Sequence, residues 1–199
     1  MSATRTLYRP ARPEDAEAIA ELLVIGGQGI VEYLWSLESP EGQTPLAVGI
    51  ERAGRDEDAL SYRNAILAER DGYPVGLLLG HLRPQSGPAD IAAIDGLPPV
   101  LHPFRVLEHR AAGTFFINGL AVRPEHRGNG IGSKLLYKSR QRAIEVGTAR
   151  ISVELFAQDE DALRLYQRHG FRILDRRPVV PHPCHRFSGD LLLLEQKLN

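Results

Sequence analysis

The sequence has little of what would mark a secreted, membrane-bound or nucleic-acid-binding protein. Its 199 residues include one cysteine, Cys184, which excludes an internal disulfide and predicts a reducing, cytoplasmic setting. The net charge of −1 gives no electrostatic signal for nucleic acid or an anionic membrane. No apolar run approaches membrane-spanning length, since the stretch at residues 191–194 is only strand-sized. The N-terminal Met-Ser-Ala-Thr-Arg lacks the apolar region of a signal peptide.

The remaining composition is typical of an ordinary globular protein. Hydrophobic residues make up 43% of the chain and charged residues 25%. A chain of this length can bury a sizeable core without disulfides or a structural metal. We therefore expect residues 1–199 to form a single domain.

The most informative segment lies at residues 113–132. An apolar strand pattern ends before Pro124, and a glycine turn at residues 127–132, Arg-Gly-Asn-Gly-Ile-Gly, leads directly into a helical pattern. Glycines remove Cβ atoms where a ligand must approach the backbone. The first turn of a helix supplies unpaired N–H groups and the positive end of a dipole. This order of elements predicts a site for a diphosphate.

The glycine turn alone leaves its ligand open. Its spacing is G-x-G-x-G rather than the G-x-G-x-x-G of dinucleotide-binding folds, and no G-x-x-x-x-G-K-[ST] of nucleoside triphosphatases occurs in the chain. A tight surface turn that begins a helix would look the same in isolation.

A second segment, at residues 157–171, narrows the choice. Ala162, Leu165, Tyr166 and His169 recur at the spacing of one helix face. Gly170 is placed to end that helix, and Phe171 begins a strand pattern.

Together the two segments resemble the GNAT superfamily of N-acetyltransferases. The motif [Q/R]-x-x-G-x-[G/A] is matched by Arg127, Gly130 and Gly132. The later motif A-x-x-L-Y-x-x-x-G-F is matched by the following residues: Ala162, Leu165, Tyr166, Gly170 and Phe171. The opening at residues 8–15 is similar to the family's first strand and helix start. The resemblance is most specific over about residues 113–176. It implies the GNAT acyl-CoA N-acyltransferase fold, an α/β (α+β) mixed central sheet with helices on both faces, and acetyl-CoA as co-substrate.

The pattern of the whole chain predicts the order β-α-(α)-β-β-β-α-β-α-β-β. Strands are expected near residues 6–9, 65–69, 75–82, 114–122, 151–156, 171–176 and 191–196. Helices are expected from residue 13, with a buried stripe of Ala16, Ile19, Ala20 and Leu23, then over 30–37, 56–63, 105–110, 131–147 and 159–169. Asp71-Gly72 predicts a hairpin turn. Residues 83–112, with five prolines, are expected to form a long excursion of the kind that is often functional.

By resemblance, acetyl-CoA is held mainly by backbone groups. The diphosphate would be bound by the N–H groups of the glycine turn and of the two residues that follow it: Arg127, Gly128, Asn129, Gly130, Ile131, Gly132, Ser133 and Lys134. The side chains of Arg127 and Lys134 would add charge or remain simply solvated. Leu120, Ala121 and Val122 would pair with the pantetheine amides as a neighbouring strand would.

Tyr166 is the candidate for the chemical step. The resemblance implies a tyrosine near the thioester sulfur, where a hydroxyl can stabilise or protonate the leaving thiolate. Full proton transfer from a phenol of pKa ~10 to a thiolate of pKa ~8.5 is uphill by about 2 kcal/mol, which favours hydrogen bonding as the larger contribution. A tyrosine that merely covers the core is the alternative.

Asp159 departs from the family pattern. Many members have an asparagine at this position that bonds the pantetheine arm, and an aspartate lacks the amide donor. Asp159 can still cap the following helix, and we favour that role.

The general base is not indicated by the motifs. Family members often carry a glutamate where this chain has Phe116 or Asn118, and neither residue can act as a base. At pH 7 an alkylamine of pKa ~10.4 is neutral in only about one part in a thousand, whereas an α-amine of pKa ~8 is neutral in about one part in ten. The missing carboxylate favours a weakly basic amine, a water relay or a base from elsewhere. Glu154 is the nearest candidate, with an exposed strand charge as the alternative, and Asn118 could position a water or the acetyl oxygen.

The tail at residues 181–185, Pro-His-Pro-Cys-His, falls short of a zinc signature because it has no second ligand pair, so no metal is expected. A stiff loop is the default interpretation, with His182 or His185 lining an amine pocket as the alternative. Trp35 and Tyr33 are expected to face the acceptor cleft or the core.

The sequence thus predicts an acetyl-CoA-dependent N-acetyltransferase that acts on the primary amine of a small molecule, peptide or protein. The alternative is a non-catalytic acyl-CoA-binding or regulatory module with the same fold. The near-zero charge and the lack of a basic aromatic face argue against a nucleic-acid module. A homodimer would fit the family, but no interface can be recognised in the sequence.

Overall fold

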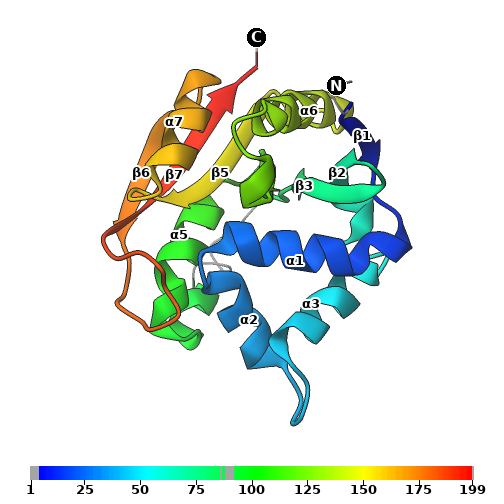
Figure 1. Ribbon diagram of the computed structural model, residues 1–199. Coiled ribbons are helices and arrows are strands. Elements are labelled where there is room, and N and C mark those ends of the chain that lie inside the picture. Colours follow the sequence, from blue (N-terminus) through cyan, green and yellow to red (C-terminus); the bar gives the residue numbers. More distant parts are fainter. Residues whose placement is uncertain (1–4, 86, 88–91, 199) are drawn as a thin grey trace. The chain divides into compact units, whose positions relative to one another are not determined.

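The computed structural model of the protein describes residues 5–85, 87 and 92–198 (Figure 1). The strands are β1 Leu7–Pro10, β2 Ala65–Arg70, β3 Tyr73–Leu82, β4 Phe115–Val122, β5 Arg150–Phe156, β6 Arg172–Pro178 and β7 Asp190–Lys197. The α-helices are α1 Ala16–Gly27, α2 Ile30–Glu38, α3 Pro45–Gly54, α5 His102–Arg110, α6 Ile131–Glu145 and α7 Glu160–Arg168. The N-terminal residues Met1 to Thr4 and Pro88, which the sequence interpretation used, lie outside the described residues.

The strands form a mixed sheet of seven in the order β1-β2-β3-β4-β5-β7-β6. β1 with β2, β2 with β3, β5 with β7 and β6 with β7 are antiparallel pairs. β4 and β5 are parallel, with Phe115, Phe116 and Ile117 opposite Ile151, Ser152 and Val153. The predicted mixed sheet is confirmed.

The chain divides into two compact units, each built from two stretches of sequence. The first unit comprises Met1–Gly80 and Asn118–Lys138, and the second comprises His81–Ile117 and Ser139–Asn199.

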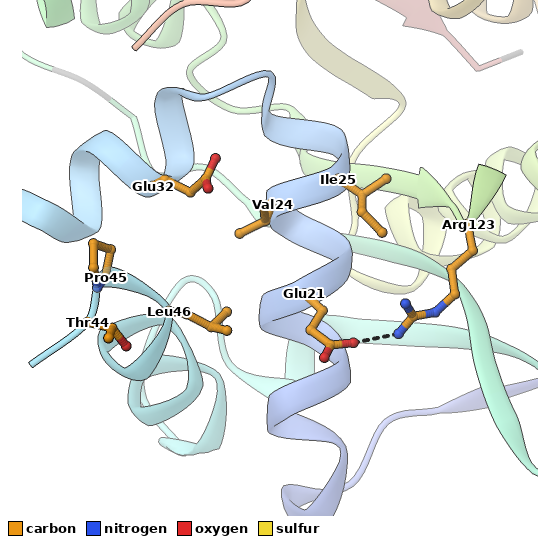
Figure 2. Close-up of a pocket in the computed structure, with 8 residues that line it drawn as sticks. All are labelled: Glu21, Val24, Ile25, Glu32, Thr44, Pro45, Leu46 and Arg123. Carbon is orange, nitrogen blue, oxygen red and sulfur yellow. Dashed lines mark hydrogen bonds and ion pairs between the residues drawn. The ribbon is translucent and has the colours of Figure 1, made fainter.

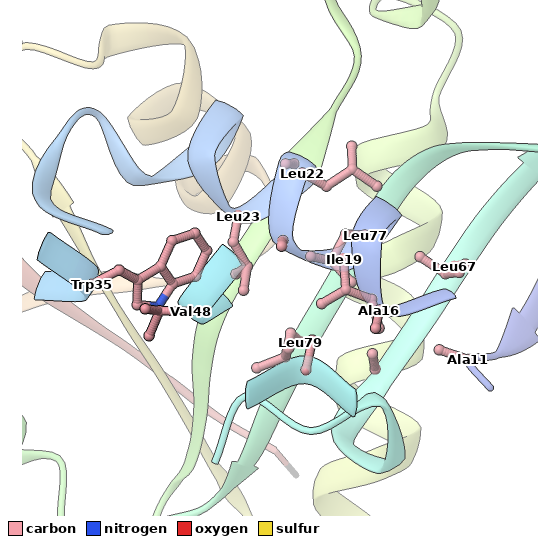
Figure 3. Close-up of a cluster of buried hydrophobic side chains, with 14 residues drawn as sticks. Ala11, Ala16, Ile19, Leu22, Leu23, Trp35, Val48, Leu67, Leu77 and Leu79 are labelled. Atoms are coloured by element: carbon pink, nitrogen blue, oxygen red, sulfur yellow. The ribbon is translucent and has the colours of Figure 1, made fainter. Parts of the chain in front are cut away.

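The core of the first unit is built around α1 (Figure 3). The predicted stripe of Ala16, Ile19, Ala20 and Leu23 is buried, so the helical periodicity of this segment was interpreted correctly. The helix ends where Gln28 and Gly29 adopt positive φ angles of 52° and 94°, because a left-handed backbone cannot continue a right-handed helix.

Trp35 on α2 completes this core, with 1% of its surface exposed. It packs on α3 at Gly49, where an added Cβ would overlap the six-membered ring of the indole. The missing side chain at Gly49 is therefore what allows α2 and α3 to enclose the indole. Of the two placements predicted for Trp35, the core is confirmed.

The helix predicted at residues 56–63 is wrong. The helix lies earlier, at Pro45–Gly54, where Thr44 caps its N-terminus by accepting a bond from the N–H of Ala47 and Pro45 occupies its first turn. Asp58 instead accepts from the N–H of Leu60 and pairs with Arg52, which holds the following segment as a turn.

The hairpin between β2 and β3 is confirmed. Asp71 and Gly72 have φ angles of 50° and 80°, as a tight turn with two left-handed residues requires. The hairpin places β3 beside β2 with Leu67 opposite Leu77.

The second unit contains the predicted excursion and most of the C-terminal strands. α5 begins at His102, earlier than predicted, because Pro103 suits the first turn of a helix. Its core joins α5 to β4, β5 and β7 through a set of buried residues: Leu107, Ala111, Phe116, Phe156, Leu191 and Leu193. For α6 the sequence pattern predicts an inward face of five residues: Ile131, Leu135, Leu136, Ala143 and Ile144. The first four are buried, but Ile144 is 68% exposed, so its predicted inward orientation is wrong.

The packing of Trp35 on Gly49 generates a stability prediction. We expect Gly49→Ala to lower the free energy of unfolding by about 1–3 kcal/mol in urea titrations, because the new methyl group has no space beside the indole. Gly54→Ala, five positions later in the same helix, is the control. Its Cβ would lie 3.8 Å from the Cβ of Ala16, an ordinary contact. Equal stability of the two variants would contradict the packing described.

Candidate functional site

The glycine turn lies between β4 and α6 in the first unit. Gly128 and Gly130 both have φ angles of +75°, which side-chain-bearing residues rarely adopt, and a Cβ at either position would meet no protein atom within 4 Å. The backbone is therefore bare on this side and open to a ligand. The open space beside the Cβ position of each glycine is compatible with a bulky anion.

Side chains of the turn itself hold it in shape. The Nε of Arg127 donates to the carbonyl of Val122 at 3.0 Å. The amide nitrogen of Asn129 donates to the carbonyls of His126 and Arg127, at 3.1 and 3.0 Å. Both residues are exposed. Arg127 thus has a bracing role that the sequence did not predict, while its charge stays at the surface.

The first turn of α6 comes directly after the glycine turn in the chain. The first bond of the helix runs from the N–H of Lys134 to the carbonyl of Gly130 at 3.1 Å. The N–H groups of Gly130, Ile131 and Gly132 come before this first helical bond in the chain. They form the positive end of the helix dipole, which faces the glycine turn. The side chain of Ile131 is buried, so only its backbone can serve a ligand. The ammonium of Lys134 lies 4.9 Å from the ring centre of Tyr137 on the exposed side of the helix.

The end of β4 is closely packed, through glycines that the sequence interpretation missed. A Cβ at Gly26 of α1 would lie 3.4 Å from the Cβ of Ala121 and 3.5 Å from the carbonyl of Leu120. A Cβ at Gly119 would overlap Leu23 of α1, and one at Gly76 of β3 would lie 3.2 Å from the carbonyl of Ala121. For Gly76 and Gly119 a signal was available in the sequence, because a glycine within a strand pattern often marks a close approach of another backbone.

Asn118 begins the part of β4 that belongs to the first unit. Its side-chain oxygen is buried and has no hydrogen-bond partner among the residues that the structure describes. The recorded ladder between β4 and β5 ends at Ile117 and Val153, one residue before it. An unsatisfied buried acceptor of this kind is uncommon and is compatible with a bond to a ligand or water.

A cavity of about 370 Å³ opens beside the end of β4, between α1, α2 and α3 (Figure 2). Its apolar walls are Val24, Ile25, Pro45 and Leu46. Arg123, the residue after β4, donates to Glu21 of α1 at 2.6 Å, which neutralises that carboxylate. Arg123 also donates to the carbonyl of Pro74 at 3.0 Å. This pair fixes α1 to the strand that leads into the glycine turn.

Tyr166 lies in the second unit, on α7. It is 4% exposed, and its ring meets that of Phe171 edge-on with centroids 5.2 Å apart. Burial raises the pKa of its phenol, and the negative charge of Asp159 adds to the rise. The hydroxyl therefore stays protonated throughout the working pH range and can act only as a hydrogen-bond donor or acid.

Asp159 caps α7. Its carboxylate accepts from the N–H of Ala162 at 3.2 Å, which confirms the favoured capping role. Of the face of α7 predicted to pack inward, only Tyr166 is fully buried, whereas Ala162, Leu165 and His169 are half-buried.

Glu154 on β5 differs from an exposed strand charge. Its Oε1 is buried and has no hydrogen-bond partner in the described part of the chain. Burial raises the pKa of its carboxyl well above the ordinary value, and the charge of Glu108 raises it further, while Arg83 and Arg105 oppose the rise. A carboxylate with a raised pKa can accept a proton at a pH where an ordinary glutamate cannot.

The tail before β7 contains an unusual histidine. His185 packs against the rings of Phe104 and Phe156, with centroids 5.9 and 5.5 Å away, and neither ring nitrogen has a partner among the described residues. Burial lowers the pKa of His185, so its imidazole is neutral. The Nδ1 of His182 accepts from the N–H of Cys184 at 3.2 Å, as expected within a tight loop.

Cys184 is poorly suited to act as a nucleophile. Burial raises the pKa of the Cys184 thiol, which disfavours the nucleophilic thiolate. Across residues 5–85, 87 and 92–198, no group of three or more metal-ligating side chains is assembled. None of the helices in those ranges is both long and apolar enough to cross a membrane.

The structure therefore brings the glycine turn, the end of β4 and Asn118 together in the first unit. Tyr166, Asp159 and Glu154 are all in the second unit.

Comparison with solved structures supports the fold. The chain superimposes on a Drosophila melanogaster polyamine N-acetyltransferase with a TM-score of 0.72 and 14% identity, covering 98% of this chain and 100% of that one. An agmatine N-acetyltransferase matches with a TM-score of 0.71 and 16% identity over 97% and 99% of the two chains. The Salmonella typhimurium protein yncA, solved with its cofactor acetyl-CoA, gives a TM-score of 0.61 and 19% identity over 98% and 95%.

Two sequence comparisons agree with this fold. The thialysine N-epsilon-acetyltransferase of Bos taurus is 29% identical over 77 residues, which span 39% of this chain and 44% of that protein. The model of the acetyltransferase (GNAT) family matches residues 31–171, well over half of the chain and including both motifs. The chain therefore belongs to the acetyltransferase (GNAT) family.

Proposed function

We propose that this acetyltransferase moves the acetyl group of acetyl-CoA directly to a primary amine, without a covalent enzyme intermediate. The observation that carries the proposal is the bare, left-handed backbone at Gly128 and Gly130, placed at the N-terminus of α6. A helix start preceded by such a turn favours a diphosphate. The raised thiol pKa of Cys184 supports direct transfer over a cysteine relay.

In this proposal the diphosphate is bound by the backbone N–H groups of residues 127–132 and by those of Ser133 and Lys134. The exposed side chains of Arg127 and Lys134 add positive charge at the rim. The pantetheine arm pairs with the backbone of Leu120, Ala121 and Val122, whose position is fixed by the close packing at Gly26 and Gly76. Because Asp159 is occupied as a helix cap, we assign it no contact with the arm.

The chemical step needs a base and a donor. Glu154 takes the proton of the ammonium, and the free nitrogen lone pair then attacks the thioester carbonyl carbon to form the C–N bond. Asn118 orders the acetyl oxygen or a water. Tyr166 donates a hydrogen bond to the sulfur as the C–S bond breaks and the electron pair leaves with the thiolate. The nitrogen, which carries one excess proton after its attack, gives that proton up to solvent, and the thiolate takes one up to become the free thiol of coenzyme A. Because the pKa of Tyr166 is raised, stabilisation by hydrogen bonding outweighs full proton transfer.

The setting of the enzyme is proposed as follows. The whole chain works as one acetyltransferase domain whose acetyl-CoA-binding core spans about residues 113–176. The single cysteine supports a cytoplasmic location. A homodimer stays a prediction from the family resemblance, which sedimentation velocity would test.

The first test concerns the glycine turn. We expect Gly130→Glu to weaken acetyl-CoA binding by more than about a hundredfold in calorimetry, because a carboxylate would face the diphosphate and fill the space that it occupies. Gly147→Glu is the matched control, since Gly147 has a φ angle of +77° and the same open surroundings but lies after α6. Undiminished binding by Gly130→Glu would exclude the turn as the diphosphate site.

The second test concerns Tyr166. We expect Tyr166→Phe to lower kcat about a hundredfold while KM for acetyl-CoA changes by about twofold or less, because the hydroxyl acts on the departing sulfur. Release of free coenzyme A thiol measures the rate. Tyr73→Phe controls for loss of a tyrosine hydroxyl, since Tyr73 is 76% exposed at the start of β3. A Tyr166→Phe enzyme with full kcat would leave the residue a purely structural role.

The third test concerns Glu154 and uses pH. Since the base must be deprotonated, the wild-type kcat/KM should fall on the acid side at a pH well above the ordinary carboxyl value of 4.5. We expect Glu154→Gln to lower kcat/KM at least about a hundredfold at neutral pH and to remove this limb of the profile.

The pH dependence of folding stability gives an independent measure of the raised pKa of Glu154, with the same substitution, Glu154→Gln. A carboxyl with a raised folded-state pKa stabilises the fold at low pH, and this contribution is lost as the pH rises through that pKa. Glu154→Gln should therefore be more stable than the wild type at pH 8, with a smaller difference at pH 5. Glu145→Gln, an exposed position on α6, should show neither effect. If the difference in stability between Glu154→Gln and the wild type does not change with pH, the raised pKa of Glu154 is contradicted.

A further inference from the structure

A cluster of four charged side chains in the second unit suggests what kind of amine is accepted. Arg83 follows β3, Arg105 and Glu108 lie on α5, and Glu154 lies on β5, against which α5 packs. Arg105 and Arg83 both pair with the same carboxylate oxygen of Glu108, at 2.6 and 3.3 Å. The charges of all three residues act on Glu154.

Two buried polar atoms of this cluster have no hydrogen-bond partner in the described residues. One is a donor, the Nε of Arg83, and the other is an acceptor, Oε1 of Glu154. Buried donors and acceptors in folded proteins are nearly always satisfied, by protein or by ordered water. A donor and an acceptor left unsatisfied in one cluster indicate that something else completes both.

The charges of the cluster form two opposite poles. Arg83 and Arg105 carry two positive charges against the single carboxylate of Glu108, which leaves one positive charge in excess. Glu154 carries the one unsatisfied negative group. No hydrogen bond joins Glu154 to either arginine within the described part of the chain, so neither pole is satisfied by the other.

Arg83 is held in place for such a role. Its N–H donates to the carbonyl of Thr114 at 2.9 Å, and its own carbonyl accepts from the N–H of Gly113 at 3.2 Å. The ring of Phe116 lies under its guanidinium, 5.1 Å from the central carbon. Its side chain remains 21% exposed. A fixed, planar guanidinium that is still accessible suits a carboxylate.

We propose that the acceptor is zwitterionic, an amino acid whose carboxylate is bound by Arg83 and Arg105 while its amine is presented to Glu154. This inference rests on the proposed function and names the substrate class of that site. It assigns Arg83 and Arg105 as specificity-determining residues, and Glu108 as a positioning residue that holds the two guanidinium groups together.

The experiment compares amino acids with their decarboxylated partners, which keep the side chain and an amine but lack the carboxylate. The pairs are L-lysine with cadaverine, L-arginine with agmatine, L-phenylalanine with phenethylamine, and L-histidine with histamine. For at least one pair, we expect kcat/KM of the wild-type enzyme to favour the amino acid by about tenfold or more, the effect of one charge-assisted hydrogen bond.

Variants of the cluster show which residues cause the preference for the amino acid over its decarboxylated partner. Arg83→Gln should raise KM for the amino acid about tenfold or more and change the value for its decarboxylated partner by about twofold or less. Arg83→Lys keeps the charge but removes Nε, and should lose most of the preference. Arg110→Gln is the matched control, since Arg110 lies on α5, the helix of Arg105, but in a separate pair with Asp175 at 2.9 Å. Glu32 of α2 lines the cavity beside α1, and Glu32→Gln should leave the preference intact.

A binding measurement avoids dependence on turnover. Each amino acid is titrated by calorimetry into the wild-type protein and Arg83→Gln, both saturated with coenzyme A, and only the wild type should bind the preferred one. The proposal is overturned if each pair reacts equally well, if Arg83→Gln weakens both members alike, or if no amino acid binds because water satisfies the two atoms. Acetylation of amines without any preference would leave the proposed function intact, whereas failure of every amine to release thiol would contradict that function instead.

Discussion

The close approach of α1 to the end of β4 is the constraint on which the cofactor half of the site depends. Gly119 permits it, since a Cβ at this position would overlap Leu23 of α1, and Gly26 of α1 lies where an added Cβ would be in van der Waals contact with Ala121. Gly76 imposes the same closeness from β3. Because the pantetheine would be read by backbone groups, their exact position matters more than the side chains they carry. The ion pair between Glu21 and Arg123 then fixes the point at which β4 turns towards the glycine turn.

The second unit contributes groups that are unfavourable for stability but useful for chemistry. Glu154 is buried without a hydrogen-bond partner among the described residues, and the pKa values of Glu154 and Tyr166 are both raised by burial. Strongly perturbed pKa values cluster at functional sites, which makes both residues candidates for the chemistry. The residues proposed as proton acceptor and hydrogen-bond donor thus belong to the same unit, while the backbone proposed to bind the cofactor belongs to the other.

The motifs predicted the fold because they are local. Strand β4, the glycine turn and helix α6 follow from residues adjacent in sequence, and the Asp159 cap and the Asp71-Gly72 turn were predicted for the same reason. The helix at Pro45–Gly54 was not predicted, although its start is marked in the sequence by the capping residue Thr44 and by Pro45 in the first turn. The environment of Glu154 could not be predicted, because Arg83, Arg105 and Glu108 reach it only through tertiary folding. The same holds for Gly119, whose need for a bare backbone depends on Leu23, distant in sequence.

The way in which the chain passes between its two compact units has a consequence for engineering. The passages lie between Gly80 and His81, between Ile117 and Asn118, and between Lys138 and Ser139. They fall inside β3, β4 and α6, and none coincides with a loop. A fragment cut at any of these points would break a strand or a helix and expose backbone groups that the intact element satisfies. Exchange of whole units between relatives by simple recombination should therefore fail, and new acceptor specificities are better sought by substituting single residues within the complete chain.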